Sequence, residues 1–124
     1  MKKTDSKLID SSVWLAYLFN GVYPDIIESD EMLLLSVMSL FEIHRKLAKI
    51  KIDSNKISRS MEFIKKRSLV IEVSKEISEK AVDFSLEFKL STIDSIIYAT
   101  SILSDATLVT LDNDFRGLKS VVVL

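Results

Sequence analysis

Four carboxylates stand out in this 124-residue sequence because each follows or interrupts an apolar run. They are Asp10, Glu42, Asp94 and Asp112, and Asp114 lies two residues after the last of them. If such groups converge, their like charges raise one another's pKa, and a hard divalent cation such as Mg²⁺ or Mn²⁺ relieves that repulsion. A dication held by carboxylates can activate a water and stabilise charge on phosphoryl oxygens. The set therefore fits metal-assisted hydrolysis of a phosphodiester bond.

The composition excludes several other kinds of site. Cysteine is absent, so the chain has no disulfide framework, no zinc–thiolate site and no thiol nucleophile. The single histidine, His44, rules out a multi-histidine metal site. It lies two residues after Glu42, about 200° away around a helix, which disfavours a shared active site. Two glycines cannot form a GxGxxG or Walker phosphate loop.

Each of the four acids also has a purely structural explanation. Glu42 follows Ser39, and Asp94 follows Ser91, at the spacing of a helix capping box. Asp10 and Asp112 could be plain N-caps of the helices that follow them. Asp114 could join a carboxylate pocket or cap a short helix that starts near residue 115. From the residues alone both explanations stay open for every acid.

The elements that must position these acids alternate along the chain. The expected strands are short apolar runs at residues 8–10, 32–37, 69–71, 107–111 and 121–124. The expected helices lie near residues 12–19, 24–28, 39–50, 57–64, 77–88 and 92–103. This order predicts an α/β fold with a central five-stranded parallel sheet flanked by helices on both faces. In such sheets, sites gather at the carboxyl ends of the strands, where the strand order reverses.

Length and hydropathy set the broad class of the chain. The length predicts a single domain over residues 1–124. The longest apolar run, residues 13–19, is too short for the roughly 20 residues that span a bilayer. Residues 1–5 lack the apolar segment of a secretory signal. We therefore expect a cytoplasmic protein that does not associate with membranes.

Charge is unevenly distributed, although the formal net charge is −1. The segment 45–67 holds nine bases and two acids, a balance of +7, and the rest of the chain carries −8. Such asymmetry is typical of a protein that meets an anionic partner on its basic side. Solvated helix faces are an equally good explanation of the pattern.

Four motifs, in order and spaced over nearly the whole chain, resemble the PIN domain. Residues 9–15 (IDSSVWL) resemble the opening signature, an aspartate after the first strand, and residues 39–43 (SLFEI) resemble the second acid. Residues 94–100 (DSIIYAT) resemble the third acidic helix, with Ser95 where alanine is common, and residues 108–115 (LVTLDNDF) resemble the T-x-D-x-D-F stretch. The chain looks most similar to the VapC-type toxin ribonucleases of toxin–antitoxin pairs.

The resemblance implies a PIN-like fold and an Mg²⁺- or Mn²⁺-dependent endoribonuclease. Asp10 and Asp94 are then the direct metal ligands. Glu42 and Asp112 complete the pocket through water or a second ion. Asp114 is a further candidate catalytic residue beside them.

Further residues and partners follow from the same resemblance. Ser11 and Thr110 are candidate hydroxyls that orient carboxylates, with capping and strand-edge hydrogen bonding as the alternative. Arg45, Lys46 and Lys49 are candidate contacts to the RNA backbone. The implied partners are RNA, a cognate antitoxin protein and a second copy of the chain in a homodimer.

Two other functions remain open at this stage. A non-catalytic PIN-like module that binds RNA or protein would keep the fold and lose the metal. A receiver-like phosphotransfer domain also has an acidic metal pocket and about this length. Receivers usually carry an acidic pair after the first strand, whereas Asp10 stands alone here.

Overall fold

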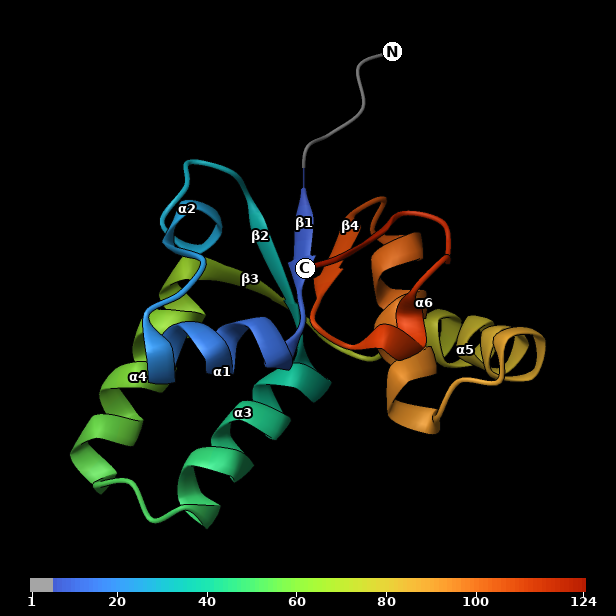
Figure 1. Ribbon diagram of the computed structural model, residues 1–124. Helices are drawn as coiled ribbons and strands as arrows, with labels where there is room; N and C mark the ends of the chain where they lie inside the picture. The colour runs from blue at the N-terminus through green and yellow to red at the C-terminus, as the bar shows by residue number, and fades with distance from the viewer. Residues whose placement is uncertain (1–5) are drawn as a thin grey trace.

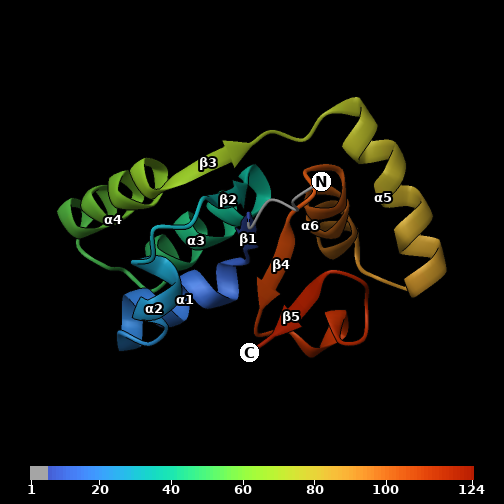
Figure 2. The same cartoon turned by 90° about the horizontal axis from the view of Figure 1, so that it is seen from above.

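The computed structural model describes residues 6–124, so the N-terminal residues 1–5, searched above for a signal segment, lie outside it. Five parallel strands form one sheet in the order β3-β2-β1-β4-β5 (Figures 1 and 2). The strands are β1 Lys7–Ile9, β2 Leu33–Ser36, β3 Ser68–Ile71, β4 Thr107–Thr110 and β5 Val121–Val123. The predicted five-stranded parallel sheet is confirmed.

Helices cover both faces of this sheet, as predicted (Figures 1 and 2). The helices are α1 Ser11–Asn20, α2 Pro24–Ile27, α3 Val37–Lys49, α4 Ser54–Arg67, α5 Lys75–Phe88 and α6 Thr92–Leu103, followed by the 3₁₀ helix η1 Asn113–Phe115. Helices α1 to α4 pack on one face, and α5, α6 and η1 pack on the other. Within residues 6–124 no helix has both the length and the apolar character needed to cross a membrane.

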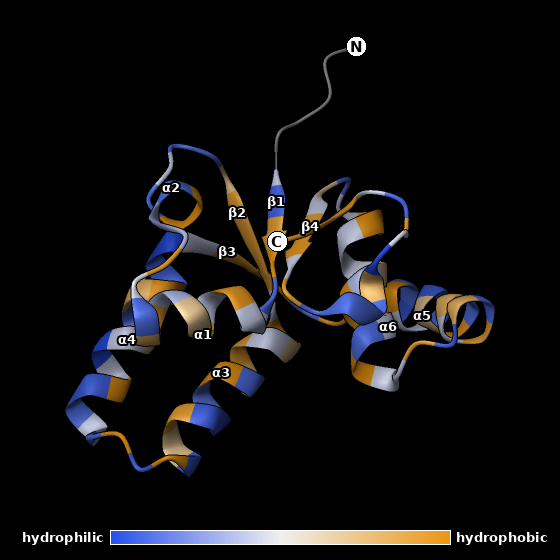
Figure 3. Cartoon of the chain, viewed as in Figure 1, coloured by the Kyte–Doolittle hydropathy of each residue, from blue (hydrophilic) through white to orange (hydrophobic). Residues whose placement is uncertain are grey.

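Two separate apolar cores result from the alternation of side chains along the strands. Ile9, Leu35 and Val109 belong to the core under α1 to α4. Their strand neighbours Leu8, Leu34 and Leu108 belong to the core under α5 and α6. Since successive strand residues point to opposite faces, strands that are apolar throughout fill both cores. Figure 3 shows this continuous hydrophobic character in β2, whereas α3 and α4 mix hydrophilic and hydrophobic positions.

The start of α3 differs from the sequence-based expectation. The helix begins at Val37, and Ser36 is its N-cap, accepting a hydrogen bond from the Met38 backbone N–H at 3.1 Å. Ser39, expected to start the helix, lies inside it, and its buried hydroxyl has no hydrogen-bond partner within the described residues. The capping-box explanation of Glu42 is therefore wrong.

The strand order reverses between β1 and β4. The chain leaves β1 toward β2 on one side and leaves β4 toward β5 on the other, so a crevice opens at the carboxyl ends of these two strands. Because α6 runs back to the start of β4, its N-terminus lies at the same edge. The order also differs from the 2-1-3-4-5 order of receiver domains, which excludes the receiver alternative.

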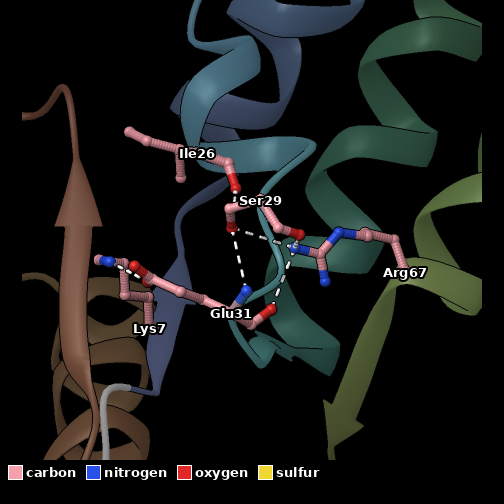
Figure 4. Close-up of polar contacts among 5 residues, drawn as sticks. All are labelled: Lys7, Ile26, Ser29, Glu31 and Arg67. Carbon is pink, nitrogen blue, oxygen red and sulfur yellow. Dashed lines mark hydrogen bonds and ion pairs between the residues drawn. The ribbon is translucent and has the colours of Figure 1, made fainter.

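The far end of α4 fastens the loop between α2 and β2 (Figure 4). The Arg67 guanidinium donates from Nε to the Ile27 carbonyl at 2.6 Å and from Nη2 to the carbonyls of Ser29 and Glu31 at 2.8 and 3.0 Å. An ion pair between Lys7 and Glu31 ties the same loop to β1. Arg67 therefore supports the fold instead of contributing a free cation to the basic segment.

Removing this guanidinium has a large expected effect on stability. We expect Arg67→Ala to lower the free energy of unfolding by about 2–3 kcal/mol, because hydrogen bonds from a charged donor are the strong ones and three carbonyls lose theirs. Arg67→Lys should restore only part of the lost stability, because a single ammonium group lacks the planar set of N–H donors that a guanidinium offers. Urea unfolding measures the effect, with the exposed neighbour Lys66→Ala as control. Equal midpoints for Arg67→Ala and Lys66→Ala would contradict this assignment.

Candidate metal centre

Asp10 lies directly after β1, at the N-cap position of α1, yet its side chain caps nothing. Its Oδ2 accepts hydrogen bonds from the hydroxyls of Ser12 at 2.9 Å and Thr110 at 2.7 Å. The residue is 6% exposed, and within residues 6–124 its Oδ1 accepts no hydrogen bond. The N-cap explanation of this carboxylate is therefore wrong. Two hydroxyls fix its orientation and leave one oxygen free for a ligand.

The same two hydroxyls connect Asp10 to the segment after β4. Ser12 Oγ accepts a hydrogen bond from the Leu111 backbone N–H at 3.0 Å, and Thr110 Oγ1 accepts one from the Asp112 backbone N–H at 3.0 Å. Thr110 was a candidate for this role from the sequence, whereas Ser12 was not. The only signal for Ser12 was its place as the second serine after Asp10. These bonds hold the ends of β1 and β4 in register at the crevice.

Three aspartates meet at this edge. One carboxylate oxygen each from Asp94, Asp112 and Asp114 lie within 4.8 Å of one another. Asp112 Oδ1 also accepts the Asp114 backbone N–H at 2.9 Å and so begins η1. Asp112 is thus both a cap and a member of the cluster. Asp114, whose place the sequence left open, joins it.

Glu42 reaches the region from α3. Its Oε1 accepts a hydrogen bond from the Ser11 hydroxyl at 3.1 Å, so Ser11 contacts a carboxylate as its prediction required. Burial raises the pKa of Glu42, the Ser11 hydrogen bond opposes that shift, and the charge of Asp10 adds to it. Asp10 and Glu42 are outside the group of three, but the charge of Asp10 raises the pKa of both Glu42 and Asp94.

Among these acids, Asp94 has the most strongly raised pKa. Burial raises its pKa to about 6, and the charges of Asp112, Asp10 and Asp114 push it in the same direction, partly offset by a hydrogen bond from Ser91. Within residues 6–124 the one ion pair joins Lys7 and Glu31, so none of these acids forms an ion pair with a described basic side chain. Asp94, Asp112 and Asp114 therefore form a negative cluster with no ion-paired partner among the described residues.

The donor set fits a hard dication. Every candidate ligand is a carboxylate oxygen, the ligand type that Mg²⁺ and Mn²⁺ prefer. Opposite ligands of Mg²⁺ stand about 4.2 Å apart, so oxygens within 4.8 Å need only small side-chain rotations to share an ion. A bound ion would also offset the burial and the repulsion that together raise the pKa of Asp94.

The candidate basic contacts fall in different places. Arg45 and Lys46 border a hollow of about 360 Å³ beside Glu42. Lys49 is exposed at the last position of α3, one turn beyond Arg45. His44 borders a different hollow, of about 620 Å³, between α3 and α4. Only Arg45 and Lys46 of these residues therefore line a hollow together with one of the acids.

Comparisons with known proteins point to one family. The sequence model of the PIN domain matches residues 7–120. A toxin–antitoxin complex from Klebsiella pneumoniae is similar at 25% identity, covering 94% of this chain and 96% of that chain, with a TM-score of 0.78. VapBC2 from Rickettsia felis, bound to a DNA fragment from its promoter, is similar at 14% identity, with coverages of 96% and 97% and a TM-score of 0.79.

A third solved structure carries a named activity. VapC20 from Mycobacterium tuberculosis, described as a toxin that cleaves the sarcin–ricin loop, is similar at 16% identity, covers 88% of this chain and 92% of that chain, and has a TM-score of 0.65. No curated protein has a sequence that matches significantly.

Proposed function

Because the chain belongs to the PIN domain family, we propose that it is a metal-dependent endoribonuclease that hydrolyses RNA phosphodiester bonds, the toxin of a VapBC-type pair. The observation that carries this proposal is the meeting of Asp94, Asp112 and Asp114 at the strand-order reversal, beside the fixed carboxylate of Asp10. Uncompensated carboxylates at such a crevice favour an enzyme over a passive binding module.

We carry the proposed roles over from the family resemblance, residue by residue. Asp10 and Asp94 would hold the ion directly, and Glu42 and Asp112 would complete its surroundings through water or a second ion. Asp114 adds its charge from the exposed side of the cluster. When bound, Mg²⁺ or Mn²⁺ would supply a water activated as nucleophile and stabilisation of charge on the phosphoryl oxygens.

The neighbouring side chains prepare the site before any substrate arrives. The hydroxyls of Ser12 and Thr110 hold Asp10, and that of Ser11 holds Glu42, which limits rotation of the carboxylates. Arg45, Lys46 and Lys49 provide positive charge along one side of α3 for the RNA backbone.

The proposed partners follow from the similar structures. One of them is described as cleaving the sarcin–ricin loop, which supports an RNA substrate. Others are described as toxin–antitoxin complexes, which supports a cognate antitoxin. We also propose a homodimer and a cytoplasmic location, where cellular RNA is available.

The direct test is cleavage of total bacterial RNA, labelled at its 5′ ends and containing tRNA, rRNA and mRNA. We expect discrete fragments with Mg²⁺ or Mn²⁺, none with excess EDTA, and recovery when the ion is added back in excess, because the carboxylates alone offer no activated nucleophile. Gel electrophoresis reads the result. Fragments that persist in EDTA, or an intact RNA pool with both ions, would overturn the proposal.

Calorimetry distinguishes the proposed enzyme from a non-catalytic binding module with the same fold. Titration with Mn²⁺ should release or absorb heat with wild-type protein and lose that signal in Asp94→Asn. A wild-type protein that does not bind Mn²⁺ would instead be a non-catalytic binding module with the same fold.

A further inference from the structure

A hollow adjoins the acidic site but contains only one of its acids. It has a volume of about 360 Å³ and is bordered by Phe41, Glu42, Arg45 and Lys46 of α3 together with Ser11, Leu15 and Ile93. Ser11 directly follows Asp10 in the chain, and Ile93 directly precedes Asp94. The hollow therefore lies next to all three acid-bearing segments on its side of the crevice. Its volume falls in the range of roughly 300–1,000 Å³ typical of small-ligand pockets.

The lining of this hollow combines an exposed aromatic ring with two exposed cations. The Phe41 ring is 59% exposed although it is a large hydrophobic group. Arg45 and Lys46 are exposed as well, and neither is paired with Glu42, since the one ion pair within residues 6–124 joins Lys7 and Glu31. An exposed ring beside two unpaired cations can receive a flat, anionic ligand.

The spacing along α3 places these groups together. Phe41 and Arg45 are four residues apart, and Glu42 and Lys46 are also four apart, so each pair shares one side of the helix. A ligand on this side of α3 would meet the ring and the cations at once, with the Glu42 carboxylate at its edge.

A nucleotide of a single strand matches this lining. Aromatic rings bind unstacked bases of single-stranded RNA by stacking, and basic side chains bind the phosphates. The bases of a duplex are already stacked and hide their faces. A purely apolar peptide segment would cover Phe41 but would leave the two cations facing no anion.

We propose that this hollow is a nucleotide subsite, in which Phe41 stacks on a base of single-stranded RNA next to the cleaved bond while Arg45 and Lys46 bind the adjoining phosphate. The inference rests on the proposed ribonuclease function, because it places the RNA beside the acidic site. It adds a positioning role for Phe41 and restricts the substrate to RNA that is unpaired at this point.

The test measures binding separately from cleavage. A fluorescein-labelled single-stranded RNA of ten mixed-sequence nucleotides is titrated with the full chain carrying Asp94→Asn in EDTA, which keeps the RNA intact, and anisotropy gives the Kd. Adding Phe41→Ala should raise Kd about tenfold, because stacking on an aromatic side chain contributes on that scale. Phe41→Trp should stay within about twofold of the parent, since it keeps a ring. The matched control is Leu86→Ala, an exposed apolar residue on α5.

Two further measurements sharpen the result. Arg45→Ala with Lys46→Ala should lower the slope of log Kd against log salt by about 0.7, because the two cations share one phosphate and each phosphate contact on a single strand contributes about 0.7. In the active protein, Phe41→Ala should shift which nucleotides flank the cleaved bonds and raise KM more than it lowers kcat. Thermal unfolding of each variant checks that the fold is kept.

The outcomes distinguish this inference from the function on which it rests. Unchanged RNA affinity in Phe41→Ala, or full rescue by the ringless Phe41→Leu, would overturn the subsite while wild-type cleavage still stands. The second result would indicate that RNA needs only an apolar side chain at this position and not a stacking ring. Absence of cleavage by the wild type would overturn the function, whatever the binding data show.

Discussion

Replacing Asp94 with asparagine should abolish RNA cleavage, lowering kcat/KM by at least about 10³-fold, or roughly 4 kcal/mol of transition-state stabilisation. Asparagine keeps the size of the side chain but removes a charge from the group formed with Asp112 and Asp114. An amide is a far weaker ligand for a hard dication than a carboxylate. Asp10→Asn should act in the same way, because its carboxylate is fixed by two hydroxyls at the same crevice. Initial rates on a defined RNA fragment, with saturating Mn²⁺, measure both variants.

The matched control is Asp83→Asn, the same chemical change at an exposed position of α5. We expect it to cleave at the wild-type rate. Circular dichroism should show that all three variants are folded, because the substitutions at the crevice remove repulsion and leave the two apolar cores intact. Full nuclease activity in purified Asp94→Asn or Asp10→Asn would refute the catalytic assignment.

The second large effect is a pH-dependent stability of the metal-free protein. The pKa of Asp94 is raised from 3.8 to about 6, so the native state binds a proton that the unfolded chain has already released. The resulting stabilisation is fully present below pH 3.8 and is lost as the pH rises through about 6. The complete shift corresponds to about 3 kcal/mol, and screening of this half-exposed group reduces the expected loss to about 1–2 kcal/mol.

Comparison with Asp94→Asn isolates that contribution, because all other acids titrate in both proteins. The variant should gain stability over the wild type between pH 4 and pH 6.5 and keep a constant advantage above pH 7, as measured by urea unfolding in EDTA. Mn²⁺ at pH 7.5 should reverse the order, stabilising the wild type by about 2.7 kcal/mol at a hundredfold excess over Kd and the variant far less. A difference between the two proteins that does not change with pH would show that Asp94 titrates normally.

Most of the fold could be predicted because its strands and helices have strong local patterns. The continuous apolar run of β2 indicated a strand buried on both faces, and α6 has the predicted limits, Thr92–Leu103. Boundaries between adjacent elements were harder. Ser36 and Ser39 both suit an N-cap, and the chain uses the first because β2 ends there. The apolar Val37 concealed that boundary by extending the run.

The candidate acids could be selected for a different reason. A carboxylate next to an apolar run is unusual, so Asp10, Glu42, Asp94 and Asp112 were visible one at a time. Their supporting contacts were not visible, because they join residues far apart in the chain. Ser12 bonds to Leu111 and Thr110 to Asp10 across 99 and 100 positions. No local pattern reports such pairs.

Arg67 is a second case in which the local sequence does not report a long-range contact. Composition placed it among the solvated bases of the basic segment, whereas it donates to three backbone carbonyls 36 to 40 positions earlier. A guanidinium used in this way looks no different in sequence from one that faces solvent. Only the packing of α4 against the loop before β2 reveals its role.

None of the candidate acids comes from α2, α4 or α5. The candidate acids come instead from the segments after β1 and β4, the second turn of α3 and the first turn of α6, while α2, α4 and α5 pack on the sheet and Arg67 of α4 also holds the loop before β2. Substitutions on the outer faces of these three helices should therefore leave the proposed RNA cleavage unchanged. Under the proposed function, a surface for other molecules could change on these helices without touching the candidate acids.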